Sequence, residues 1–269
     1  MSNTLRKASV KGSFYPNTCT EINAYVDIFN REFDKHTIPK ETRFIVPRAI
    51  LVPHAGYVYS GFTANFAYRF LENAQPKRIV VIGPSHRYGF RGISGSFYDA
   101  FETPCGNIEI DNPYLTTLAK EFNIEFQEQA HRNEHSTEVQ MPFIQHYFPN
   151  IPVIELVYGD FSPQKLSSII VALLQNSDNV VVISSDLSHF YPLEEAHNHD
   201  NVCLTAVAKL DTTLIHQGCE ACGNIGIEAM ILASHSLKLQ SKLLDYRTSA
   251  TASGDESSVV GYLSAMFYA

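Results

Sequence analysis

Residues 78–86, RIVVIGPSH, join a short apolar run to a sharp turn and a histidine. An apolar run of this length, bounded by Gly and Pro, is typical of a strand that is buried on both faces. Two further stretches have the same order: residues 49–54 read AILVPH, and residues 179–189 read NVVVISSDLSH. The repetition predicts three buried strands, each ending shortly before a histidine.

Segments with helical periodicity separate these strands. Thr18 and Glu21 can form a capping box in front of a helix whose apolar residues run from Ile22 to Phe33. Further helices are expected at 62–71, from Asn112 onward, and at 163–174, 193–210 and 226–236, with further strands at 153–158, 239–248 and 259–267. The alternation predicts one α/β domain over residues 1–269, in which helices flank a largely parallel central sheet.

The composition and charge of the chain argue against a nucleic-acid-binding protein and against a membrane protein. The chain has 269 residues, 45% of them hydrophobic, and a formal net charge of −8. Nucleic acid is excluded as an expected partner because there is no cluster of Lys and Arg to neutralise phosphates. No apolar run approaches the roughly 20 residues of a membrane helix, and the first ten residues lack a secretory signal. We therefore expect a cytoplasmic protein without membrane contact.

Five cysteines are scattered along the chain: Cys19, Cys105, Cys203, Cys219 and Cys222. An odd, dispersed set predicts no disulfide framework and fits a reducing compartment. Cys219 and Cys222 form one Cys-x-x-Cys pair, which alone is a weak signal for zinc. Cys222 precedes a predicted helix, where a thiolate is favoured and can serve as a soft metal ligand. The alternative is a small buried side chain.

Three histidines follow three predicted strands: His54, His86 and His189. The carboxyl ends of parallel strands lie along one edge of a sheet, where open α/β folds bind their ligands. Imidazole binds zinc, copper or iron, and it also transfers protons near pH 7. One such histidine would most simply be a hydrogen-bonded loop residue. Three of them predict a shared metal-binding or acid–base cleft.

A second polar cluster is Glu134-His-Ser-Thr-Glu138. If it is helical, His135 and Glu138 share a face and can bind a metal, orient its ligands or relay a proton. A capped helix start is an equally good interpretation, and Pro142 does not fit the interior of such a helix. Asp186, three residues before His189, either orients an imidazole or caps the next helix. The remaining histidines considered lack supporting context and are expected at the surface: His131, His197, His199, His216 and His235.

Ordered motifs along nearly the whole chain resemble those of the MEMO family, specifically its prokaryotic branch, AmmeMemoRadiSam system protein B. The matching blocks are GSFYP (12–16), VPHAGYVYSG (52–61), GPSH (83–86), EHSTE (134–138), SSDLSH (184–189) and ACG (221–223), with TS (248–249), GD (254–255) and VVGY (259–262) near the end. The resemblance implies a fold similar to that of the class III extradiol dioxygenases.

The same resemblance implies a division of roles within the cleft. His54, His86 and Cys222 match the metal-binding positions of the family, and His189 matches the general acid/base. Apart from the resemblance, our leading hypothesis has His135 and Glu138 contact the substrate or orient the ligands. Iron, copper and zinc are the candidate metals. Because Cys222 stands where non-haem iron oxygenases carry a carboxylate, ring cleavage is not expected, and copper or zinc is favoured.

Three functions follow from these residues. The first is a metal-dependent, oxidoreductase-like enzyme with an unknown small-molecule substrate, in which Asp186 assists His189. The second is a binding or scaffold protein with a vestigial site, accessory to a radical-SAM protein and an AMMECR-type domain protein, as the family name implies. The third makes Cys222 a nucleophile with His189 as its base, which leaves His54 and His86 without a role.

Overall fold

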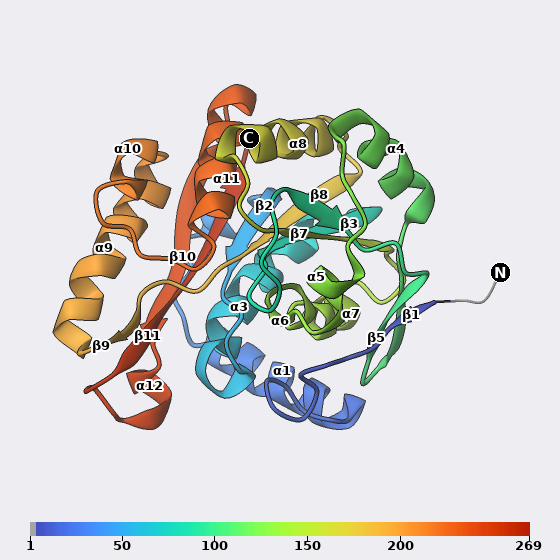
Figure 1. Cartoon of the computed structure of the whole chain (residues 1–269). Helices are drawn as coiled ribbons and strands as arrows, with labels where there is room; N and C mark the ends of the chain where they lie inside the picture. The colour runs from blue at the N-terminus through green and yellow to red at the C-terminus, as the bar shows by residue number, and fades with distance from the viewer. Residues whose placement is uncertain (1–3) are drawn as a thin grey trace.

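The computed structural model describes residues 4–269, and one mixed sheet lies at its centre (Figure 1). Four parallel strands form the middle of the sheet, in the order β2 (Pro47–Val52), β8 (Asn179–Ser184), β3 (Arg78–Pro84) and β7 (Val153–Tyr158). Antiparallel strands continue it at both ends: β11 (Val259–Tyr268) and β10 (Gln240–Thr248) beyond β2, and β4 (Ile93–Gly95) beyond β7. The predicted parallel sheet is confirmed at its centre, and the last two predicted strands run antiparallel.

Side chains of the central strands alternate between two core layers. In β2, Ala49 and Leu51 belong to one apolar cluster, and Ile50 and Val52 belong to the other. All four are at most 1% exposed. Burial on both faces is why these strands are continuous apolar runs rather than alternating polar and apolar residues.

Helices cover both faces of the sheet (Figure 1). One layer contains α4 (Asn112–Phe122), α8 (Pro163–Gln175), α9 (Leu193–Lys209) and α11 (Asn224–Leu237). The other contains α1 (Cys19–Phe33), α3 (Tyr57–Leu71) and α7 (Met141–Tyr147). The capping box of Thr18 and Glu21 is present at α1. Pro142 lies in the first turn of α7, where a missing N–H costs nothing, so residues 135–147 form two helices rather than one.

The remaining elements are short. A small sheet joins β1 (Leu5–Arg6), β5 (Ala100–Thr103) and β6 (Gly106–Glu109), and β9 (His189–Tyr191) pairs with β11. The short helices are α2 (Lys40–Arg43), η1 (Glu72–Ala74), α5 (Glu128–Arg132), α6 (His135–Glu138), α10 (Thr212–Ile215) and α12 (Ala250–Ser253). Among residues 4–269, no helix has the length and apolar character needed to cross a membrane.

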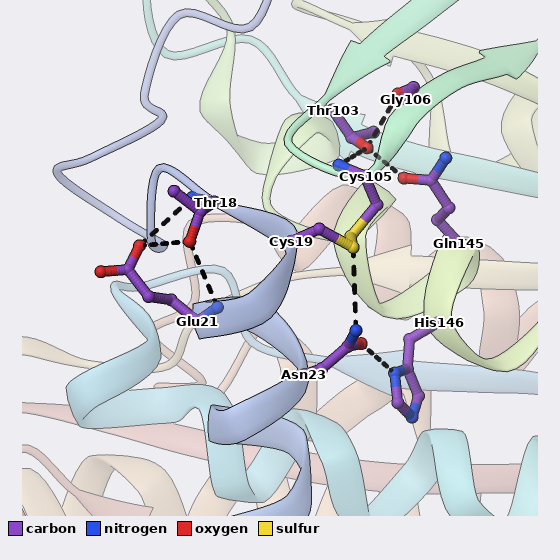
Figure 2. The surroundings of a disulfide bond; sticks show 9 residues. All are labelled: Thr18, Cys19, Glu21, Asn23, Thr103, Cys105, Gly106, Gln145 and His146. Atoms are coloured by element: carbon purple, nitrogen blue, oxygen red, sulfur yellow. Dashed lines mark hydrogen bonds between the residues drawn. A yellow bond between two sulfur atoms is a disulfide. The ribbon is translucent and has the colours of Figure 1, made fainter.

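Two disulfides correct the expectation that the cysteines stay unpaired. Figure 2 shows Cys19, in the first turn of α1, bonded to Cys105 in the turn between β5 and β6. The side-chain amide of Asn23 lies between the Cys19 sulfur and the His146 ring. Cys203 and Cys219 form the second bond, which leaves Cys222 free. The sequence did not indicate either pairing, because each depends on how separate elements meet in space.

Candidate metal centre

Neighbouring parallel strands bring the candidate ligands together. His54 follows the end of β2 and His86 follows the end of β3, while β8, which lies between them, leads into residues 185–189. Cys222 lies in the segment directly before α11. One ligand atom each of His54, His86 and Cys222 lies within 4.8 Å of the others, and His54 Nε2 is 3.3 Å from Cys222 Sγ. The predicted convergence of these three residues is present.

A buried serine decides which nitrogen of His54 is free. The Ser184 hydroxyl donates to the carbonyl of Ser136 at 2.6 Å and accepts from the Gln140 amide at 3.0 Å. His54 Nδ1 lies 2.9 Å from the same oxygen. Because the single hydroxyl proton is already committed to a carbonyl, His54 Nδ1 must carry a proton and donate. Its Nε2 lone pair therefore faces Cys222. Burial, together with the nearby His86 and His135, holds the pKa of His54 well below its usual range, so the ring is neutral.

A buried carboxylate fixes the proton of His86 on Nδ1 in a similar way. Glu134 accepts hydrogen bonds from the backbone N–H of His86 at 2.5 Å, from His86 Nδ1 at 3.0 Å and from the N–H of Ser136 at 2.9 Å. Burial alone would raise the pKa of Glu134, but these bonds and the charge of His86 lower it to about 2. An ionised carboxylate only accepts, so His86 Nδ1 is the donor and Nε2 is left for a metal. His86 is also the most exposed of the three candidate ligands, and it opens the site to solvent.

The Cys222 sulfur sits against backbone donors. The N–H of Asp186 points at Sγ from 3.3 Å, and Ser185 Oγ is 3.8 Å away. Gly223 permits this approach, since a Cβ there would lie 2.6 Å from the side chain of Ser185. Burial and the neighbouring Asp186 carboxylate raise the pKa of the Cys222 thiol to about 12. Without a cation the residue is therefore a thiol rather than the thiolate expected at a helix start.

Asp186 orients His54 rather than the expected His189. Its Oδ1 accepts the backbone N–H of His54 at 2.7 Å, and its Oδ2 lies 3.9 Å from His54 Nε2. The burial of this carboxylate raises its pKa. His189 lies on β9 and lines a cavity of about 350 Å³ together with Cys222. Its position therefore places an imidazole beside the ligand group.

His135 adds a further ring to the cluster. Its centroid lies 4.6 Å from that of His86 and 5.4 Å from that of His54. Burial lowers the pKa of His135. Its Nδ1 is buried and has no hydrogen-bond partner within residues 4–269, although Glu134 is 3.3 Å away. One ligand atom each of His86, Glu134 and His135 also lies within 4.8 Å of the others, but Glu134 already accepts hydrogen bonds from His86 and Ser136.

Glu138 lies away from the cluster and corrects the expectation of a ligand-orienting or substrate contact. Its carboxylate pairs with the guanidinium of Arg6, and both side chains are fully buried. It also accepts from Ser9, Val10 and the Tyr15 hydroxyl. Arg6 in turn donates to the carbonyl of Glu134 at 2.6 Å. Glu138 therefore fixes the N-terminal segment against α6, next to the residue that orients His86.

The roles of two orienting residues, Ser184 and Glu134, were not predicted from the sequence, and the location of His131 was predicted wrongly. Ser184 and Glu134 begin the motifs SSDLSH and EHSTE, but nothing in the spacing of these motifs indicated which atoms the two side chains would contact. His131 was expected at the surface, yet it is fully buried, with Nδ1 3.1 Å from Glu155 and Nε2 2.9 Å from Ser94. The burial of a polar partner could have been predicted, because the charged Glu155 lies in the apolar run VIELVY and requires a buried partner there.

The donor set fits a metal ion. In a tetrahedral site with metal–nitrogen and metal–sulfur bonds of typical length, the nitrogen and sulfur lie about 3.5 Å apart. The 3.3 Å between His54 Nε2 and Cys222 Sγ agrees with this value. Two imidazoles whose Nδ1 atoms are already hydrogen-bonded, together with one thiol, suit zinc, copper or iron. The fold and the site thus define an α/β protein with a histidine–histidine–cysteine group that can bind a metal at the carboxyl edge of its parallel strands.

Comparison with known proteins identifies the family. The family model described as Memo-like protein matches residues 6–266, and the chain belongs to this family. MEMO1 family proteins of Aquifex aeolicus and Methanobrevibacter smithii are 36% and 33% identical to it, over 98% of this chain and 99% of theirs. The crystal structure of an uncharacterized protein, JW3007 of Escherichia coli K12, shares the fold. Its TM-score is 0.52 at 14% identity, over 81% of this chain and 98% of that one.

Proposed function

We propose that the chain is a metal-dependent, oxidoreductase-like enzyme acting on a small molecule, with His54, His86 and Cys222 as the metal ligands. The observation that carries this proposal is the fixed orientation of both imidazoles. Ser184 and Glu134 each bind an Nδ1–H, so that both Nε2 lone pairs remain available beside Cys222 Sγ. Orientation of this kind is characteristic of metal-ligating histidines, and a structural histidine does not require it.

Three protein ligands leave coordination positions for a substrate, as in catalytic metal sites. When bound, the metal would supply Lewis acidity or redox chemistry to a substrate oxygen. The exposure of His86 and the cavity beside His189 and Cys222 support access for a small molecule. The thiol in place of a carboxylate argues against ring cleavage of the dioxygenase type.

Two further imidazoles are proposed to move protons. His189 lines the same cavity as Cys222, where it can exchange a proton with a bound substrate. Burial keeps His135 neutral near pH 7, so that its ring can accept a proton. Asp186 supports the site by fixing the backbone of His54 and by donating its own N–H to the sulfur.

Nitric oxide binding tests the open position without knowledge of the substrate. Protein loaded with ferrous iron under nitrogen is exposed to nitric oxide and examined by electron paramagnetic resonance. We expect an S = 3/2 signal in wild type, a changed signal in Cys222→Ser, and a wild-type signal in the control His197→Ala. Iron that binds without any nitrosyl signal would contradict an open catalytic site and favour the scaffold function instead.

A further inference from the structure

The second disulfide lies next to a proposed metal ligand. Cys219 stands three residues before Cys222, and its partner Cys203 is a fully buried residue of α9. Cys219 and Cys222 line the same cavity of about 350 Å³, together with His189. One sulfur at this cavity is therefore free, and its neighbour is held by a bond to another helix.

The backbone around Cys219 makes few hydrogen bonds. No backbone N–H of residues 218–221 donates a hydrogen bond to another part of the chain between residues 4 and 269. Gly218 has a φ of +115°, and apart from its own neighbours in the chain no heavy atom of residues 4–269 lies within 4 Å of the position where its Cβ would be. From Cys222 onward the chain is fixed again, since Cys222 N–H donates to Asp186 at 3.3 Å and Gly223 N–H donates to Ser185 at 2.9 Å. The Cys219 sulfur is thus held by the disulfide and by the packing of its side chain, which is 6% exposed in the same apolar cluster as Cys203, rather than by backbone hydrogen bonds.

Cys219 and Cys222 also have the spacing of a chelating pair. Two cysteines separated by two residues commonly bind one metal ion through both thiolates. Here the pair directly precedes α11, and Cys222 already lies 3.3 Å from His54 Nε2. To reach the same ion, a released Cys219 would leave its packing in the apolar cluster and turn into the cavity that it already lines with Cys222, by movement of residues 218–221.

We propose that reduction of the Cys203–Cys219 disulfide supplies Cys219 as a second thiolate ligand, converting a His₂Cys site into a His₂Cys₂ site. A dithiol gives two electrons and two protons: its own disulfide forms, the Cys203–Cys219 bond breaks, and two thiols result. The Cys219 proton then leaves when the sulfur binds the metal. Four protein ligands close a site, whereas three leave it open. The disulfide would therefore determine whether a coordination position is free. This inference rests on the proposed metal site.

X-ray absorption of zinc-loaded protein counts the sulfur ligands directly. Oxidised wild type should show one sulfur per zinc, and wild type that has been reduced and freed of reductant under nitrogen should show two. Cys203→Ser should show two without reduction, because Cys219 then has no partner. Cys219→Ser should show one in both states. The double variant Cys19→Ser/Cys105→Ser removes the other disulfide and should behave as wild type in both states, which controls for reduction elsewhere.

A single sulfur in both reduced wild type and Cys203→Ser would overturn the inference and leave the three-ligand site intact. Zinc absent from every form would instead contradict the proposed metal site itself. Intact-mass measurement after thiol alkylation confirms which cysteines are paired in each sample. A free Cys203 and Cys219 in protein purified and handled under oxidising conditions would also overturn the inference, because no disulfide would then be present to control the ligand.

Discussion

The Nδ1 atom of His54 lies 2.9 Å from the hydroxyl oxygen of Ser184, whose own proton is donated to the carbonyl of Ser136. This relationship fixes the tautomer of His54 and directs its Nε2 lone pair toward Cys222. Replacing Ser184 by alanine removes the acceptor and allows the other tautomer. We expect zinc affinity to fall about 10- to 100-fold, as for other residues that orient a metal ligand.

Competition titration with a chromophoric chelator measures this loss. Ser234→Ala is the matched control, since Ser234 is also fully buried and its hydroxyl donates to the carbonyl of Met230 in the same helix. The control should keep wild-type zinc affinity. Equal affinities in wild type and Ser184→Ala, in a variant that remains folded, would show that the tautomer does not depend on this hydroxyl.

Glu134→Gln tests the orientation of His86. The amide has nearly the same shape as the carboxylate but carries no charge and has one acceptor oxygen instead of two, so it cannot accept from His86 N–H, His86 Nδ1–H and Ser136 N–H together. We again expect zinc affinity to fall about 10- to 100-fold, with a smaller effect on the free energy of unfolding. Glu128→Gln, in an exposed pair with Arg132, serves as a charge-matched control and should not change zinc binding.

Metal binding should release the proton of the Cys222 thiol at neutral pH. Burial and Asp186 raise the pKa of the Cys222 thiol to about 12, so the apo protein holds this proton throughout the range from pH 7 to 9. The low pKa of His54 means that this ring holds no second proton there. Affinity should therefore rise about tenfold per pH unit, because binding requires the thiolate. Calorimetry in two buffers of different ionisation enthalpy gives the proton count, and Cys222→Ser should release one proton fewer than wild type.

Arg6 and Glu138 should be coupled in stability. Removing one partner leaves the other charge buried, so Arg6→Met should lower the free energy of unfolding by about 3–5 kcal/mol. Arg6→Met/Glu138→Gln should lose less than the sum of the two single variants. The exposed pair Arg132–Glu128 should give a coupling of at most about 1 kcal/mol. Urea unfolding measures all six variants, and additive losses for Arg6 and Glu138 would contradict a coupled buried pair.

Much of the central fold follows from local sequence. The apolar runs of β7 and β8 have the predicted bounds, because strands buried on both faces have few polar residues to obscure them. The capping box of α1 is equally local, with both partners within one turn. The antiparallel direction of β10 and β11 was not predictable, since an apolar strand pattern does not indicate how the strand is paired.

The site was predictable in position but not in detail. Strand ends alone indicated that His54 and His86 would meet, whereas the family resemblance was needed to include Cys222. The contact between Glu138 and Arg6 joins residues 132 positions apart, and the Cys19–Cys105 bond spans 86. Such pairs depend on the packing of complete elements, so spacing in the sequence carries no information about them.

The metal content of protein purified without a histidine tag is the most direct test of whether His54, His86 and Cys222 bind a metal. Wild type and the variants His54→Ala, His86→Ala, Cys222→Ser and His197→Ala are loaded with zinc, dialysed and measured by elemental analysis. We expect close to one zinc per chain in wild type and in the control His197→Ala, whose side chain is exposed. The three ligand variants should retain a small fraction of that amount while remaining folded. Zinc retained at wild-type levels by folded His54→Ala, His86→Ala and Cys222→Ser would contradict the assigned ligand set.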